Sequence, residues 1–351
     1  MSGRPGPVSG REVRGGRWPR PGGPGPGALD AQAGAHAGRP RVPAGGGEGV
    51  GRFCGALGRL GRTAAGNLRG MSRHVAIVTD STAYLPPRTM RRHGITAVPL
   101  TVVLGDEVLE DGSEVSAGAV AEALRKRRSV TTSRPSPETF AAAYRAAAGS
   151  GATGVVSLHL SAEFSGTYDA AVLAARDAPV PVRVLDTGVV AMALGFCALE
   201  AAQVAEMGGT LDEAVAAAEK RARATSAYFY VDTLDYLRRG GRIGAAQALL
   251  GSALAVKPLL HLDEGRIELL EKVRTASKAI GRLRDIVVER AGAGEVDIAV
   301  HHLAAPERAA ALAEQLGDRV PGLGELHVSE VGAVIGAHTG PGLLGAVVSP
   351  R

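Results

Sequence analysis

The amino-acid sequence predicts an α/β protein with two folded domains behind a structureless tail. Over residues 71–225, short apolar runs alternate with helical patterns, which favours an N-terminal doubly wound, mainly parallel sheet. Over residues 226–351, consecutive strand patterns mix with helices, which indicates a C-terminal α+β domain with a mixed sheet. Residues 1–70 hold 21 glycines and 8 prolines without apolar periodicity, so we expect this Gly/Pro/Arg-rich tail to be disordered.

The tail also carries the basic excess of the chain. It has 11 arginines against three acids, a formal charge of +8, and subtracting this from the +5 of the whole chain leaves −3 for residues 71–351. Nucleic-acid binding by the core is therefore not favoured. The tail itself is open to three interpretations: a basic arm, an organellar transit peptide, or upstream sequence from a misassigned start. We favour the last, because Met71 opens a segment typical of the start of a compact α/β protein.

Composition excludes several protein classes. The chain has two cysteines, Cys54 and Cys197, which provide neither a disulfide framework nor a cysteine metal site. There is no run of about 18 consecutive apolar residues and no secretory signal with a discrete apolar segment. We therefore expect a soluble, cytoplasmic protein.

The first domain consists of successive strand, turn and helix patterns. Strands are expected at 75–78, 96–104, 155–160 and 182–185. Helices are expected at 86–93, 117–127, 137–148, 169–177 and 211–224, and a further long helix after residue 188 is expected to end at about residue 207. Ser116 and Ser136 are expected to cap two of these helices, and Thr210 with Glu213 forms a predicted capping box. The connections 105–112 and 129–137 are predicted as a turn-rich segment and a loop.

Three strands of this domain end in polar clusters, at residues 80–82, 161–165 and 186–187. Ligands of parallel sheets bind outside the carboxyl ends of the strands, so we expect the three clusters to share one rim. The second cluster precedes a helix, whose unpaired N–H groups and partial positive charge favour an anion. The alternative is that Ser161, Ser165 and Thr167 only cap that helix.

The second domain is predicted from hairpin and helix signals. Strands are expected at 228–231, 256–262, 266–273, 296–301 and 325–331, and helices at 233–239, 245–254, 275–290 and 306–316. The turn Asp263-Glu264-Gly265 should close a hairpin. The chain ends in a predicted glycine-rich loop around His338, and such a loop lets backbone approach a ligand closely.

Common catalytic motifs are missing from the sequence. It has no phosphate-binding loop of the G-x-x-x-x-G-K-[ST] type, no G-x-S-x-G around the candidate serines, and no H-E-x-x-H. The histidines at 301, 302, 327 and 338 lack metal-ligand spacing, so no metal site is expected. The polar groups that remain are Thr131, Thr132, Ser133, Ser161, Ser165, Arg242 and His338. Such a set binds an anionic head group but contains no matched nucleophile and base.

Eight segments in order resemble the landmarks of the DegV family, over about residues 74–349. They are V-T-D-S-T-A-Y-L at 78–85, T-T-S-R-P-S at 131–136, the S-G-T-Y segment within 160–168, V-L-D-T at 184–187, L-R-R-G-G-R-I-G at 237–244, V-K-P at 256–258, E-K-V-R-T at 271–275 and G-A-H-T-G-P-G at 336–342. The family comprises two-domain bacterial proteins that bind a fatty acid, some of which present it to a fatty acid kinase. The resemblance implies a binding protein without cofactor, metal or catalytic residue.

The resemblance also implies where the ligand lies. The acyl chain is expected in a tunnel of the α/β domain, with its carboxylate near the domain interface. The implied ligand-binding residues are Thr131, Ser133, Ser161 or Ser165, Arg242 and His338. The sequence departs from the family pattern at Arg134, where glutamine is usual, and at Ala162, where a second serine is usual. The second departure leaves the choice between Ser161 and Ser165 open.

Partners follow from the same resemblance. We expect a long-chain fatty acid as ligand, a separate fatty acid kinase subunit as protein partner, and transient contact with a membrane. Arg274 is the expected contact with the kinase, although it could instead pair with Glu271 on the same strand segment. The alternative function is an acyl or phosphoryl hydrolase that uses Ser161 or Ser165 near His338.

Overall fold

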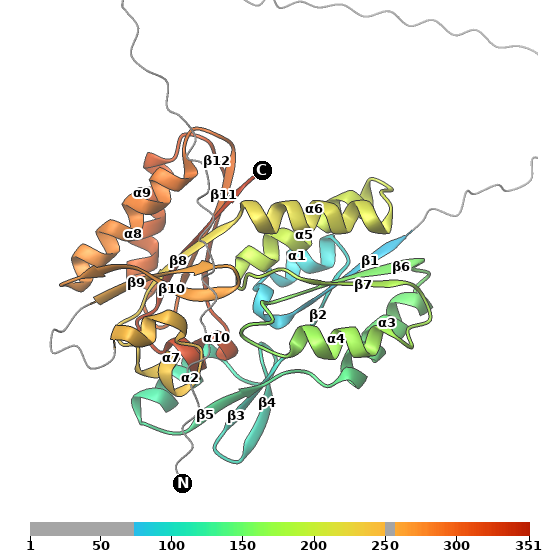
Figure 1. The fold of residues 1–351 in the computed structure, drawn as a ribbon, viewed down its shortest axis with the longest axis horizontal. Coiled ribbons are helices and arrows are strands. Elements are labelled where there is room, and N and C mark those ends of the chain that lie inside the picture. The colour runs from blue at the N-terminus through green and yellow to red at the C-terminus, as the bar shows by residue number, and fades with distance from the viewer. Residues whose placement is uncertain (1–73, 250–256) are drawn as a thin grey trace, which may run out of the picture. The chain divides into compact units, whose positions relative to one another are not determined.

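The computed structural model describes residues 74–249 and 257–351. This part of the chain contains three β-sheets, and Figure 1 shows helices packed on both faces of the parallel one. The arrangement confirms the predicted α/β class, with a parallel sheet first and a mixed sheet after it. The predictions for residues 1–70, and for residues 250–256 of the second half, lie outside the described residues.

The parallel sheet has four strands in the order β2-β1-β6-β7. They are β1 Val75–Asp80, β2 Ile95–Val98, β6 Gly154–His159 and β7 Val182–Asp186. Every residue of β6 is buried, as expected for a strand covered on both faces. Because β1, β6 and β7 run parallel and adjacent, their carboxyl ends meet at one edge, which confirms the predicted rim.

Helices cover this sheet on both sides. They are α1 Pro87–Arg92, α3 Pro137–Gly149, α4 Thr167–Ala175, α5 Met192–Glu206 and α6 Leu211–Ala224, with a short 3₁₀ turn η1 Ser81–Ala83. α5 and α6 pack together on one face, and α3 and α4 pack on the other (Figure 1). The predicted helix starts are confirmed at Ser136, whose Oγ accepts from Thr139 N, and at the Thr210–Glu213 capping box.

A three-stranded antiparallel sheet, in the order β4-β3-β5, corrects three predictions. Its strands are β3 Thr101–Leu104, β4 Glu107–Glu110 and β5 Val130–Ser133, and α2 Ala117–Arg125 precedes β5 with Ser116 as its cap. The single strand predicted at 96–104 is wrong, because Pro99 has no N–H to continue the ladder and the chain leaves the parallel sheet there. The turn predicted at 105–112 contains β4, and the loop predicted at 129–137 begins with β5; both are short, partly polar strands.

The second half of the chain builds a six-stranded mixed sheet in the order β10-β9-β8-β13-β11-β12. Its strands are β8 Ser226–Tyr230, β9 Lys257–Asp263, β10 Arg266–Val273, β11 Val296–His302, β12 Leu323–Glu330 and β13 Leu344–Pro350. The sheet begins at Ser226, where the second domain is predicted to start. Val347 of this sheet shares an apolar cluster with Leu194 of α5, so the core is continuous across that position.

Local signals in this half mostly predict the structure. Glu264 and Gly265 have φ of 45° and 78°, the positive pair that a tight hairpin turn requires, which confirms the β9–β10 hairpin. The helices are α7 Asp235–Arg239, η2 Gly244–Leu249, α8 Ala276–Ala291, α9 Pro306–Arg319 and α10 Ala333–Thr339. α8 and α9 pack on the six-stranded sheet. The described part of the helix predicted at 245–254 is the 3₁₀ turn η2.

The C-terminal segment differs from the glycine-rich loop that the sequence predicts. Residues 333–339 form α10, which ends where Gly340 adopts a φ of 73°. β13 then runs through the middle of the six-stranded sheet, and six of its seven residues are buried. The strand shows no polar alternation because both of its faces are covered, so periodicity did not reveal it. His338 therefore lies on a helix and not in a loop.

Candidate functional site

A cavity of about 330 Å³ lies among β5, β8, β13, α10 and the segment 160–166 that follows β6. Its walls are mostly apolar, and they include Leu100, Leu160, Phe164, Val190, Phe229 and Ile335. The volume is at the lower end of the roughly 300–1,000 Å³ typical of small-molecule sites. Among the described residues that line it there are two arginines and no aspartate or glutamate. The cavity therefore suits a ligand with a large apolar body and an anionic group.

The polar residues that line the cavity include Tyr228 of β8, His301 of β11 and Thr339 of α10, and six more come from four separate segments. β5 and the residue after it contribute Thr132, Ser133 and Arg134, the 160–166 segment contributes Ser165, the turn after α7 contributes Arg242, and α10 contributes His338. The structure thus brings Ser133, Ser165, Arg242 and His338 together around one cavity. Thr132 and Arg134 line it as well, although they are not among the predicted ligand-binding residues.

Thr131 has a different position from the predicted one. β5 alternates between half-buried and exposed residues, and Thr131 is exposed and does not line the cavity. Thr132 is half-buried, lines the cavity and faces α10. The sequence-based choice of Thr131 treated this segment as a loop, in which the two-residue alternation of a strand does not apply.

His338 is held from β5 and is neutral. Its Nε2 lies 2.8 Å from Thr132 Oγ1, and its Nδ1 is buried with no hydrogen-bond partner among the described residues. Burial, with a smaller contribution from the positive charge of Arg242, lowers the pKa of His338 to about 4. A neutral imidazole has one donor and one acceptor nitrogen, so His338 offers the site a dipole and not a charge.

Arg242 supplies positive charge in a fixed position. Its Nε donates to the carbonyl of Phe164 at 2.9 Å, and its Nη1 donates to the carbonyl of Gly240 at 2.6 Å. The side chain is half-buried, and Gly241 takes a φ of 70° in the turn that leads to it. Because two of its nitrogens are bound to backbone, the guanidinium is held in the cavity wall and is not a freely moving surface group.

The two candidate serines have different surroundings. Ser165 lines the cavity, and its Oγ lies 2.8 Å from Thr167 Oγ1. Ser161 is fully buried, does not line the cavity, and donates its hydroxyl to the carbonyl of Gly265 at 2.8 Å. The interpretation of these hydroxyls as caps is wrong, because the residue preceding α4 is Gly166 and no side chain bonds to the free N–H groups there.

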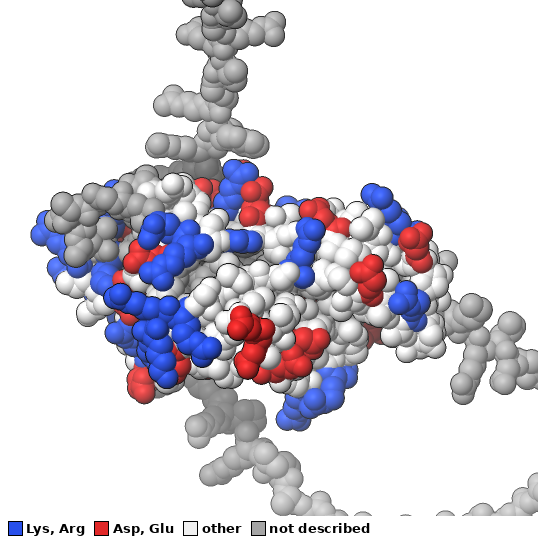
Figure 2. Space-filling model, turned by 90° about the horizontal axis from the view of Figure 1, so that it is seen from below, with Lys and Arg blue, Asp and Glu red and all other residues white. Residues whose placement is uncertain are grey.

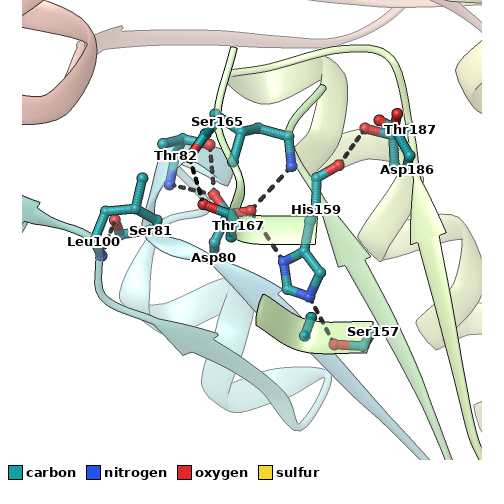
Figure 3. A network of polar contacts seen from close by, with 12 residues as sticks. Asp80, Ser81, Thr82, Leu100, Ser157, His159, Ser165, Thr167, Asp186 and Thr187 are labelled. Atoms are coloured by element: carbon teal, nitrogen blue, oxygen red, sulfur yellow. Dashed lines mark hydrogen bonds and ion pairs between the residues drawn. The ribbon is translucent and has the colours of Figure 1, made fainter. Parts of the chain in front are cut away.

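The rim at the strand ends holds the 160–166 segment in place (Figure 3). Asp80 Oδ2 accepts from Leu160 N at 3.0 Å, and Asp186 Oδ1 accepts from Ala162 N at 3.1 Å. Thr187 donates to the carbonyl of His159 at 2.8 Å. The carboxylates of the rim are thus bound to backbone, and they position the segment that carries Ser165.

Arg274 is exposed and directly follows β10. Glu271, its alternative partner from the sequence, forms an ion pair with Arg282 at 2.8 Å instead. Figure 2 shows that basic and acidic side chains gather in separate groups on the side where Figure 1 draws α2, α7 and β5.

Comparison with known proteins identifies the family. Residues 74–351 match the family model described as "Uncharacterised protein, DegV family". The chain belongs to the DegV family. A DegV domain-containing protein of Streptomyces coelicolor is 78% identical over 281 residues, covering 80% of this chain and 100% of that protein.

Solved DegV structures share the fold. One, a DegV family protein from Thermus thermophilus described as fatty acid binding, has a TM-score of 0.75 and 37% identity over 79% of this chain and 100% of that one. DegV of Bacillus subtilis, described as a fatty acid binding protein, has a TM-score of 0.74 and 36% identity over 80% and 100% of the two chains.

Sequence reasoning missed a buried polar network in this DegV protein. Ser157 Oγ lies 2.7 Å from His159 Nε2, and His159 Nδ1 lies 3.1 Å from Asp80 Oδ2 (Figure 3). Tyr144 donates to Ser157 at 2.9 Å. The order is that of a serine–histidine–aspartate triad, but all four side chains are fully buried and none lines the cavity. Ser157 and His159 are two residues apart in β6, so their side chains lie on the same face of the strand. This spacing is the only sequence signal for the network.

Over residues 74–249 and 257–351, no cluster of histidine, cysteine and acidic side chains has the arrangement of a metal site. Within the same residues, the helices are too short or too polar to cross a bilayer.

Proposed function

We propose that this protein binds a long-chain fatty acid, with the acyl chain in the apolar part of the cavity and the carboxylate at its polar end. The observation that carries the proposal is the lining itself, which combines apolar walls with two arginines and no acidic residue among the described residues. Solved relatives at 36–37% identity are described as fatty acid binding, which supports the same ligand here.

The carboxylate is held by hydroxyls, one imidazole and a guanidinium. In our assignment Thr132, Ser133, Ser165, Arg242 and His338 surround it, and Thr132 replaces the predicted Thr131. Each hydrogen bond to a charged group contributes roughly 1.5–3 kcal/mol, and each buried CH₂ about 0.8 kcal/mol. A long acyl chain thus contributes as much as several of these hydrogen bonds, while the polar groups also fix its orientation.

We further propose that the protein does not itself turn over its ligand. Ser165 pairs with Thr167, Ser161 pairs with the backbone of Gly265, and the near nitrogen of His338 pairs with Thr132. No serine of the cavity therefore has a histidine as its hydrogen-bond partner among the described residues, which disfavours the hydrolase alternative. The role we assign is presentation of the bound acid to a separate, ATP-dependent fatty acid kinase in the cytoplasm, with exposed Arg274 as a kinase contact.

The ligand is tested directly by mass spectrometry and titration. Full-length protein is purified under native conditions, denatured and extracted, and the extract is analysed for lipid. We expect stoichiometric long-chain fatty acid, and we expect delipidated protein to bind added oleate. Absence of lipid in the extract together with no binding of oleate would overturn the proposal.

A further inference from the structure

Arg134 lies at the polar end of the cavity. It directly follows β5, lines the cavity and is exposed at its opening. Its guanidinium packs against the backbone of Gly166, where a Cβ would overlap it. The missing side chain at Gly166 thus makes room for this arginine beside Ser165.

Arg134 and Arg242 contact the same short segment from two directions. Arg242 donates to the carbonyl of Phe164, and Arg134 lies on Gly166, so Ser165 is between the two contacts. The two arginines are far apart in the sequence, because Arg134 follows β5 and Arg242 follows α7. Two positive charges are therefore gathered at one end of one cavity.

Nothing in the described protein neutralises this pair. The Arg134 guanidinium has no ion pair or hydrogen bond to another described residue, and no aspartate or glutamate lines the cavity over the described ranges. Other arginines of the fold do have carboxylate partners, such as Arg183 with Asp212 and Arg282 with Glu271. Like charges placed together without a counter-charge favour the binding of an anion near both.

We propose that Arg134 is a specificity-determining residue that binds the ligand's carboxylate together with Arg242. This inference rests on the proposed function and deepens it. Two histidines line the cavity, His301 and His338, and both are neutral because burial lowers the pKa of each to about 4. The positive charge of the lining therefore comes from the two guanidinium groups, and the site distinguishes an ionised head group from an uncharged one. A ligand with the same chain and an uncharged head group loses the contribution of Arg134, whereas an ionised fatty acid keeps it.

The size of the effect is limited by exposure. An exposed ion pair contributes no more than about 1 kcal/mol, which corresponds to roughly a fivefold change in Kd. Interactions of exposed charges also weaken as salt screens them. The contribution of Arg134 should therefore be moderate and should decline with ionic strength.

The test compares oleate with oleyl alcohol on delipidated full-length protein. Arg134→Gln should weaken oleate binding about fivefold at low salt and leave oleyl alcohol unchanged. Gly166→Ala, which forces Arg134 away, should act in the same direction. Arg145→Gln serves as the matched control, because Arg145 is an exposed arginine of α3 outside the cavity lining. This variant should bind oleate and oleyl alcohol with wild-type affinity. Circular dichroism and thermal melts verify that each variant is folded.

The outcomes separate the two proposals. An oleate Kd that is unchanged by Arg134→Gln, or an equal loss for oleate and oleyl alcohol, would overturn the role of Arg134 and leave the fatty acid site intact. Wild-type protein that binds neither ligand would overturn both. A loss confined to oleate that shrinks between about 0.05 and 0.5 M salt supports the charge contact.

Discussion

Thr132 Oγ1 lies 2.8 Å from His338 Nε2, a hydrogen bond between residues 206 positions apart in the chain. It joins β5 of the three-stranded sheet to α10, and both residues line the cavity. The bond fixes the ring of His338, whose other nitrogen has no partner among the described residues. The polar end of the cavity is thus assembled from segments that meet only in the folded protein.

The first prediction separates Thr132 from Thr131. Thr132→Val keeps the shape of the side chain but removes the hydroxyl, so His338 loses its partner and the carboxylate loses a donor. We expect the Kd for oleate to rise about tenfold, as for the loss of one charge-assisted hydrogen bond. Thr131→Val is the control, because Thr131 is exposed and does not line the cavity, so this variant should bind oleate like the wild type. Equal affinities of the two variants in a titration would contradict the assignment.

The second prediction separates Ser165 from Ser161. Ser165→Ala should weaken oleate binding about tenfold with little change in stability, because Ser165 lines the cavity. Ser161→Ala removes the bond to the Gly265 carbonyl and should lower the free energy of unfolding by about 1–2 kcal/mol without a change in affinity. Urea unfolding measures the free energy of unfolding of both variants, and titration measures their Kd for oleate. A larger affinity loss in the Ser161 variant would reverse the assignment.

The parts of the site that could be predicted depend on local sequence signals. Strand ends of a parallel sheet are polar and adjacent by topology, so the rim at Asp80 and Asp186 followed from the order of strands and helices. The Thr210 capping box and the hairpin turn at Gly265 are likewise set by neighbouring residues. These features need no knowledge of what packs against them.

The parts that could not be predicted depend on tertiary contacts. β5 is four residues long and, among the described strands, pairs only with β3. Nothing local therefore distinguishes it from a loop or shows that Thr132 faces α10. β13 is apolar except for the buried Ser349, because α8 and α5 pack against it from the rest of the fold. The pairing of Ser161 with Gly265 spans 104 residues, and no spacing in the sequence reveals it.

The third prediction concerns pH. Burial lowers the pKa of both His338 and His301 to about 4, below the roughly 6.5 of an unfolded histidine. Between those values the unfolded chain binds more protons than the folded one, so stability falls as the pH is lowered from about 6.5 to 4. Each imidazole should cost on the order of 2 kcal/mol at pH 5. His338→Asn should reduce the difference between urea unfolding at pH 7.5 and pH 5, and an unchanged difference would exclude His338 as a source.

The fourth prediction concerns the buried network of Tyr144, Ser157, His159 and Asp80. If Ser157 holds the network together, Ser157→Ala leaves the imidazole of His159 without its 2.7 Å partner and should lower the free energy of unfolding by about 1–3 kcal/mol. Ser150→Ala, at an exposed helix end, should change it by less than about 0.5 kcal/mol.

The same variant tests the triad-like order of these residues. A nucleophilic serine must reach its substrate, whereas Ser157 has no exposed surface and already accepts a hydrogen bond from Tyr144. The Ser157→Ala protein should therefore retain the wild-type oleate affinity once its folded fraction is taken into account. Wild-type protein should show no hydrolysis of p-nitrophenyl esters that depends on Ser157. Any background rate should therefore be the same in the Ser157→Ala variant. Ester hydrolysis that depends on Ser157 would show that the network opens to substrate, and it would assign to β6 a catalytic role in place of the structural one that its burial supports.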